Sequence, residues 1–289
     1  ALASDRLVTP DKVYTFSVTR ARHGKHGTGC VLSSAIASYL TLGYPLPDAC
    51  RLGQHYVAGF IRSNDTNLGM HNRVESTVPE VDLYRIPLQY ITDYKEGVSI
   101  PEQVEAVCKG GCRWVQLRMK EADREEFTRI GRTVKEICKR HGALFLVNDN
   151  VDIALAMDAD GVHVGQSDME AGDVRAKLGP DKIIGVSAQT VAQALQAEAH
   201  GADYLGVGAV FPTGSKDDAD DVSYDTLKAI CKAVSIPVVA IGGITRENVT
   251  ELAGTGICGV AVISAIYGAP DIRAAAQELK AATEGMLKA

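Results

Sequence analysis

The chain has 289 residues, enough for one large or two modest domains, and its 46% hydrophobic and 23% charged residues are typical of a globular protein. Its formal net charge of −6 argues against a general nucleic-acid surface. We expect no membrane association, since no apolar run approaches the roughly 20 residues of a spanning helix. Seven cysteines without disulfide-framework spacing, and a start without the regions of a secretion signal, favour reduced thiols and a cytoplasmic protein.

Residues 1–70 form a block of their own. Leu7–Thr19 alternates loosely and predicts one or two strands. A glycine-rich loop, Arg22–Cys30, leads into an expected helix at Val31–Leu40, and a second helix is expected at Pro47–Ile61. A glycine-rich loop that meets a helix N-terminus suits a phosphate, although the same pattern often makes only a turn. The block is too small for an independent domain of this kind.

The run His26–Ala37 (HGTGCVLSSAIA), followed by Gly43-Tyr-Pro45, resembles the C-terminal part of hydroxymethylpyrimidine (phosphate) kinases, which have a ribokinase-like fold. The pyrimidine-binding half of those kinases and most of their sheet have no counterpart here, so we expect no kinase activity. The resemblance implies an anion hole with a cysteine beside the phosphoryl acceptor, formed by Gly27, Thr28, Gly29 and Cys30.

Residues 71–86 lack clear periodicity and contain a proline, which is typical of a linker. Beyond them, over 87–289, short apolar strands alternate with helices. Strands are expected at 88–92, 112–117, 143–147, 160–164, 182–187, 203–208, 237–241 and 257–263. Helices are expected at 100–109, 123–141, 150–157, 169–178, 190–200, 224–234, 246–253 and 270–284. This alternation predicts an α/β protein with a (β/α)8 TIM barrel, preceded by the partial ribokinase-like segment.

The functional groups of such a barrel lie at the C-terminal ends of its strands. The second strand ends in Gln116-Leu-Arg-Met-Lys120, where Gln116, Arg118 and Lys120 alternate onto one face. Two cations and an amide on one face could clamp an anion, because a guanidinium grips phosphate with a planar fork. A solvated strand end is the alternative.

Two carboxylates follow the third and fourth strands, Asp149 and Asp168. A right-handed crossover places these strands side by side, so both carboxylates are expected at the same rim. Beside the amide of Asn148 they would suit Mg²⁺ and a phosphorylated substrate, although Asp and Asn also favour helix N-caps. His163 lies between valines in the fourth strand, and we expect it to point inward or pack structurally rather than act as a base.

The later strand ends supply hydroxyls, glycines and a lysine in Ser187, Phe211–Lys216, Gly242-Gly243 and Ser264. Loops after the seventh and eighth strands form the recurrent phosphate site of these barrels. The acidic run Asp217–Asp221 is expected to be a solvated, mobile lid, since like charges repel. The strand ends together predict two anionic substrates, one held as a Mg²⁺-diphosphate and one as a monophosphate.

Residues 88–284 resemble thiamine-phosphate synthase (thiamine-phosphate pyrophosphorylase). The motifs that match, each at an expected strand end, are Gln-Leu-Arg-x-Lys (116–120), Asn-Asp (148–149), Gly-x-His-x-Gly-Gln-x-Asp (161–168), Pro-Thr-x-Ser-Lys (212–216), Gly-Gly-Ile (242–244) and Ile-Ser (263–264). The resemblance implies condensation of hydroxymethylpyrimidine diphosphate with hydroxyethylthiazole phosphate to give thiamine phosphate and pyrophosphate, through a pyrimidine carbocation.

The resemblance also implies which residues bind the substrates. Asp149 and Asp168 would carry Mg²⁺, and Arg118, Lys120 and Lys216 would be catalytic. The residues implied for the pyrimidine diphosphate are Gln116, Leu117, Arg118, Met119, Lys120, Asn148, Ser187 and Lys216. Those implied for the thiazole phosphate are Thr213, Gly214, Ser215, Gly243, Ile263 and Ser264, where Ser215 replaces a common threonine and keeps the hydroxyl.

Two other functions stay open at this point. One is a relative that aromatises a thiazole carboxylate phosphate on the same barrel, although it does not require the diphosphate and metal residues. The other is a non-catalytic phosphate-binding module. We expect small-molecule partners, with a homo-oligomer as an open alternative. The first block could be a degenerate remnant, or the chain could be the C-terminal part of a bifunctional kinase–synthase.

Overall fold

The computed structural model describes residues 2–10, 12–21, 24–42, 44–63, 66–68, 71, 83, 86–166, 168–179, 182–212 and 222–288. The chain divides into two compact units, Ala1–Val81 and Asp82–Ala289. Most of the predicted linker, 71–86, lies outside the described residues. Among the described helices, none combines the length and the apolar character that crossing a membrane requires.

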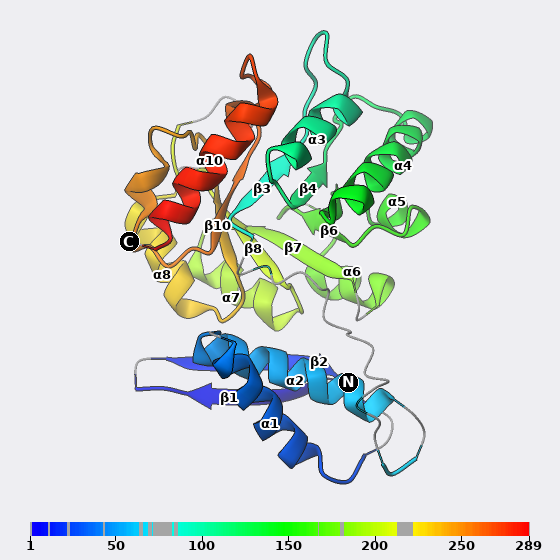
Figure 1. Ribbon diagram of the computed structural model, residues 1–289, viewed down its shortest axis with the longest axis vertical. Helices are drawn as coiled ribbons and strands as arrows, with labels where there is room; N and C mark the ends of the chain where they lie inside the picture. Colours follow the sequence, from blue (N-terminus) through cyan, green and yellow to red (C-terminus); the bar gives the residue numbers. More distant parts are fainter. Residues whose placement is uncertain are drawn as a thin grey trace. The chain divides into compact units, whose positions relative to one another are not determined.

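The first unit contains a hairpin of two antiparallel strands, β1 (Leu2–Val8) and β2 (Val13–Thr19), and two helices, α1 (Thr28–Thr41) and α2 (Leu46–Arg62) (Figure 1). The helix α1 starts earlier than expected because Gly27 adopts a φ of 81°, which glycine tolerates, and turns the loop directly into the helix. Gln54 of α2 donates to the backbone oxygen of Phe16 at 3.0 Å, and this bond ties the helix to the hairpin.

The second unit is a closed barrel of parallel strands, and the TIM-barrel prediction is confirmed (Figure 1). Its strands are β3 (Leu88–Ile91), β4 (Trp114–Leu117), β5 (Leu144–Asn148), β6 (Gly161–Val164), β7 (Ile183–Ala188), β8 (Tyr204–Val207), β9 (Val238–Ile241) and β10 (Gly259–Val262). Each strand pairs with the next along the chain, and β10 pairs with β3 to close the barrel. The C-terminal ends of all these strands therefore meet at one end of the barrel.

Helices follow the strands and surround them (Figure 1). They are α3 (Ile100–Lys109), α4 (Arg124–His141), α5 (Val151–Ala156), α6 (Ala171–Leu178), α7 (Val191–Ala199), α8 (Tyr224–Ala233), α9 (Ser264–Tyr267) and α10 (Ile272–Met286). The helix predicted at 246–253 is only a 3-10 turn, η3 (Val249–Leu252), because Gly254 and Gly256 turn the chain with positive φ angles directly after it. The short helix α9 was not predicted.

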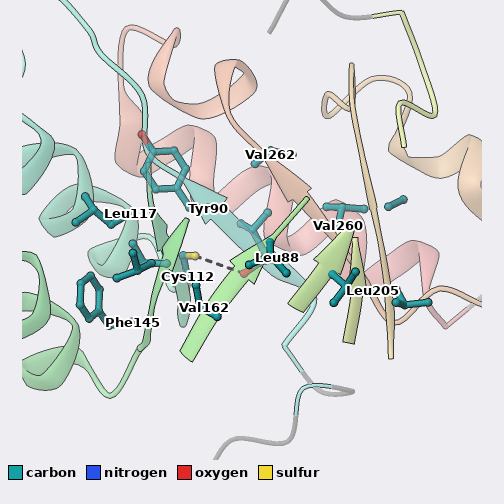
Figure 2. Packing of buried hydrophobic residues seen from close by; sticks show 14 of the residues in the cluster. Leu88, Tyr90, Cys112, Leu117, Phe145, Val162, Leu205, Val260 and Val262 are labelled. Atoms are coloured by element: carbon teal, nitrogen blue, oxygen red, sulfur yellow. Dashed lines mark hydrogen bonds between the residues drawn. The ribbon is translucent and has the colours of Figure 1, made fainter. Parts of the chain in front are cut away.

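Strand residues alternate between the helix layer and the barrel interior. Tyr90 of β3 and Leu117 of β4 belong to the buried hydrophobic cluster that Figure 2 shows. The hydroxyl of Tyr90 donates to Gln103 of α3 at 2.6 Å, which places this face against the helices. Gln89 and Gln116 lie between these apolar positions and point the other way, into the barrel, where they line a cavity. The alternation thus packs the core and aims polar side chains at one site.

Candidate active site

A cavity of about 470 Å³ opens at the C-terminal ends of the barrel strands, where TIM barrels carry their active sites. Most of the predicted site residues line this cavity: Gln116, Arg118, Lys120, Asn148, Asp149, Asp168, Ser187, Gly243, Ile263 and Ser264. A smaller hollow of about 370 Å³ shares Arg118, Lys120, Asn148 and Asp149 with it and adds Met119. The fold therefore brings together residues that are up to 148 positions apart in the chain, from Gln116 to Ser264.

Some predicted residues do not join this group. Thr213, Gly214, Ser215 and Lys216, together with the acidic run Asp217–Asp221, lie outside the described residues. Leu117 is fully buried in the hydrophobic core, and a Cβ added at Gly131 of α4 would lie 3.2 Å from it. Its side chain thus faces the helix layer and not the cavity, because neighbouring strand residues point to opposite faces. Any contact of Leu117 with a substrate would come from its backbone.

Arg118 is a nearly buried cation, with 4% of its surface exposed. Its Nη1 donates to Asp93 Oδ2 at 2.9 Å, and the Thr92 hydroxyl holds its backbone through bonds of 2.9 Å to both N–H and C=O. Its Nη2 is buried and has no hydrogen-bond partner within the described part of the chain. An unpaired buried donor costs about 1–3 kcal/mol. A guanidinium held in place with one unused donor on a cavity wall fits an anionic ligand.

The two predicted carboxylates reach the same cavity from neighbouring strands. Strand β5 pairs with β6 so that Asn148 lies opposite His163, and the Asp149 N–H donates to the His163 oxygen at 2.7 Å. The Asn148 amide donates to Asp149 Oδ2 at 2.5 Å, and an oxygen of Asp168 accepts the Gly165 N–H at 2.7 Å. Both side chains are therefore oriented at the rim by local bonds.

The alternative that these carboxylates are helix N-caps is wrong. Asp149 has a φ of 61°, which is uncommon for a residue other than glycine. Because of this turn, Asn150 is the N-cap of α5, and its side chain accepts the Ile153 N–H at 2.9 Å. Helix α6 begins after Glu170 without a side-chain cap. Neither Asp149 nor Asp168 therefore caps a helix.

Two carboxylates and an amide lie at one rim of the cavity, and their oxygens are ligands of the kind that Mg²⁺ binds. Among the residues that the structure describes, no group of three or more His, Cys, Asp or Glu side chains could hold a metal ion. Mg²⁺ is usually bound by one or two carboxylates that are completed by substrate phosphates and water. The donor set therefore fits a Mg²⁺ that is held together with a phosphorylated ligand, and not a site built from protein alone.

The opposite wall of the cavity is made by Gly242, Gly243, Ile263 and Ser264. Gly243 has a φ of 62°, and a Cβ there would lie 2.5 Å from the Pro212 oxygen, so no other residue fits without a shift of the backbone. Asn248 donates to the Gly243 oxygen at 2.9 Å and holds the loop. Backbone and small side chains at this wall can approach a ligand closely.

The sequence interpretation missed Gln89, which lines the cavity, and Tyr204, which is hydrogen-bonded to it in the barrel interior. Both are fully or almost fully buried, and Gln89 donates to the Tyr204 hydroxyl at 3.0 Å. His163 points inward and contacts the same tyrosine, with its Nδ1 2.8 Å from Oη. The one signal available in the sequence was a glutamine inside the apolar strand Leu88–Ile91, because a buried amide needs partners.

Comparison with known proteins shows the family of the barrel. Residues 88–266 match the family of thiamine monophosphate synthase. This chain belongs to that family. It is 48% identical to the thiamine-phosphate synthase of Clostridium beijerinckii over 202 residues, which cover 70% of this chain and 96% of the relative. A solved structure of thiamine phosphate pyrophosphorylase from Pyrococcus furiosus has 42% identity and a TM-score of 0.66, covering 71% of this chain and 98% of the other.

The first unit matches a second family. Residues 1–75 match phosphomethylpyrimidine kinase, which confirms the predicted kinase resemblance. The chain is 41% identical over 271 residues to the chloroplastic thiamine biosynthetic bifunctional enzyme of Arabidopsis thaliana, covering 86% of this chain but 51% of that protein. The chain thus spans about half the length of the bifunctional relatives that it matches. The kinase-like part is N-terminal in this chain.

Proposed function

We propose that this chain is a thiamine-phosphate synthase. It would condense hydroxymethylpyrimidine diphosphate with hydroxyethylthiazole phosphate to form thiamine phosphate and pyrophosphate. The observation that carries this proposal is the buried Arg118, with its unused donor, beside Lys120 and the two rim carboxylates in one cavity. This set of residues suits a diphosphate with its metal ion. The alternative reaction, aromatisation of a thiazole carboxylate phosphate, does not require such a site.

The reaction exchanges one bond for another at the pyrimidine CH₂ carbon. The C–O bond to the diphosphate breaks, and its electron pair leaves with pyrophosphate. The lone pair of the thiazole nitrogen then forms the C–N bond. That nitrogen carries no proton, so no general base is needed at this step. The demand on the protein is to neutralise charge on the departing diphosphate.

The proposed roles combine the positions of the described side chains with what the family resemblance implies for the others. Arg118 and Lys120 would bind the diphosphate, joined by Lys216, Asn148, Met119 and Ser187, while Gln116 would orient the pyrimidine. Asp149 and Asp168 would hold Mg²⁺, which when bound supplies further positive charge at the leaving group. The thiazole phosphate would lie against Gly243, Ile263 and Ser264, with Thr213, Gly214 and Ser215 from the adjoining segment.

The test is product formation by the purified chain from both substrates. We expect thiamine phosphate and pyrophosphate in equal amounts, no product when either substrate is omitted, and loss of turnover with EDTA that added Mg²⁺ restores. Circular dichroism establishes that the sample is folded. A folded chain that makes no thiamine phosphate with both substrates and Mg²⁺ would overturn the proposal, and full turnover in EDTA would remove the metal from it.

A further inference from the structure

A chain of hydrogen bonds runs through the barrel interior beneath the cavity, and Gln89 lies at its centre. In one direction the Gln89 amide donates to Gln116 Oε1 at 3.2 Å. Gln116 in turn donates to Asn148 Oδ1 at 2.6 Å, and Asn148 donates to the carboxylate of Asp149. Gln116 therefore uses its oxygen towards Gln89 and one N–H towards Asn148, which sets the orientation of its amide at the cavity wall.

In the other direction Gln89 donates to the hydroxyl of Tyr204 at 3.0 Å. Tyr204 Oη lies 2.8 Å from His163 Nδ1, and His163 Nε2 lies 3.0 Å from Ser187 Oγ. This branch ends at Ser187, which lines the cavity. The two branches thus connect a buried centre to residues on both sides of the proposed diphosphate site.

The direction of each bond in the second branch follows from the first donor. Complete burial raises the pKa of Tyr204, so its hydroxyl keeps the proton. Oη accepts from Gln89, and we assign its own proton to the contact with His163 Nδ1 at 2.8 Å. A neutral imidazole that accepts at Nδ1 carries its own proton on Nε2 and donates it to Ser187 Oγ. The proton of Ser187 is then available to donate into the cavity.

Packing holds this arrangement in place. A Cβ at Gly185 of β7 would overlap the ring of Tyr204, and a Cβ at Gly206 of β8 would lie 3.0 Å from His163 Cε1. Trp114 meets the Tyr204 ring edge-on, with ring centroids 4.6 Å apart. Two glycines make room for the tyrosine and the histidine, and the tryptophan keeps the tyrosine from rotating.

We propose that Gln89, Tyr204 and His163 are positioning residues that set the direction of the hydrogen bonds at the active site. Through them Ser187 acts as a donor to the diphosphate, and Gln116 presents a fixed amide to the pyrimidine. This inference rests on the proposed synthase function. The competing explanation is that the three residues only fill the barrel interior.

A double-mutant cycle separates the two explanations. We expect Ser187→Ala and Tyr204→Phe each to lower kcat by about tenfold to a hundredfold, the scale of one lost hydrogen bond to a charged group. The KM for the thiazole phosphate should stay near its wild-type value. Because Tyr204 acts through Ser187, the double variant should fall no further than Ser187→Ala alone. Independent effects that multiply in the double variant would overturn the proposal.

Tyr90→Phe is the matched control. Tyr90 is a fully buried tyrosine on β3 whose hydroxyl is also bonded to a glutamine side chain, here as the donor to Gln103 at 2.6 Å. It faces the helix layer, outside the chain of bonds described above. We expect its kcat to stay near the wild-type value. A loss as large as that of Tyr204→Phe would mean that any buried hydroxyl has this effect, and the proposal would fail.

Two substitutions of His163 test the donor directly. A glutamine amide reaches the place of Nε2 and can donate to Ser187, whereas an asparagine amide reaches only the place of Nδ1. We expect His163→Gln to keep a several-fold higher kcat than His163→Asn, and equal kcat values would contradict a donor role. If wild type makes no thiamine phosphate, the proposed function fails first; if wild type is active and the variants behave otherwise than stated, only this inference fails.

Discussion

The two units of this chain differ in how much of a site each one brings together. In the barrel, motifs after β4, β5, β6, β7, β9 and β10 converge on one cavity, because a closed parallel sheet places all its strand ends on one side. In the first unit, the glycine-rich loop leads directly into α1, and Cys30 is exposed within the first turn of that helix. A motif at one strand end can be assigned a function when the fold places the residues of the other strand ends next to it. We therefore assign the proposed activity to the barrel.

The largest effect is expected at Arg118. Replacing it with alanine removes a buried cation from the proposed leaving-group site, and we expect kcat to fall by about a thousandfold. The matched control is Arg113→Ala, since Arg113 donates to the backbone oxygens of Cys108 and Cys112 at 2.8 and 2.9 Å, away from the cavity. Steady-state kinetics of both variants decide the matter. Equal losses would mean that the barrel needs both arginines for folding and not for catalysis.

Lys120→Ala and Asp149→Ala come next, with an expected loss of about a hundredfold or more in kcat each, since each removes one charge contact in the transition state. Asp152→Ala is the control for the carboxylate, because Asp152 lies three residues on, in α5, and pairs with Lys177 of α6 at 2.6 Å. It should keep a near wild-type kcat. A near-normal rate in either Lys120→Ala or Asp149→Ala would contradict the mechanism.

A smaller effect is expected at Gly243. An alanine there would place its Cβ 2.5 Å from the Pro212 oxygen, in a left-handed backbone conformation. The loop would have to shift, so we expect the KM for the thiazole phosphate to rise by about tenfold, the scale of one lost ligand contact. The KM for the pyrimidine diphosphate should change little. A rise in that second constant alone would reverse the assignment of the two phosphate positions.

The smallest effect on activity is expected in the first unit. Gln54→Ala removes buried bonds to the Phe16 oxygen at 3.0 Å and to the Asp5 carboxylate at 2.7 Å. We expect about 1–3 kcal/mol less stability in that unit, seen as faster amide hydrogen exchange in α1 and α2, with kcat unchanged. A parallel fall in kcat would show that activity of the barrel depends on the first unit. That result would contradict our assignment of the activity to the barrel alone.

Much of the barrel could be predicted because apolar runs end at polar residues or glycines with a regular spacing. Crossover handedness was enough to place Asp149 and Asp168 at one rim. Whether Asp149 caps a helix or lines the cavity could not be predicted from the sequence. It depends on the φ of 61° at Asp149, because this turn makes Asn150 the N-cap of α5. The alternation of Gln116 and Arg118 left Leu117 on the other face of the strand, but which face meets the helices was beyond the sequence, because parallel strands are buried on both faces.

The central claim is that the cavity holds a diphosphate between its basic residues and a Mg²⁺ carried by the rim carboxylates. The most direct measurement is isothermal titration of pyrophosphate into the folded chain with and without Mg²⁺. We predict tight binding with Mg²⁺, much weaker binding without it, loss of the Mg²⁺ effect in Asp149→Ala and Asp168→Ala, and weak binding throughout in Arg118→Ala. Binding that is equal with and without Mg²⁺, and unchanged in all three variants, would contradict the claim.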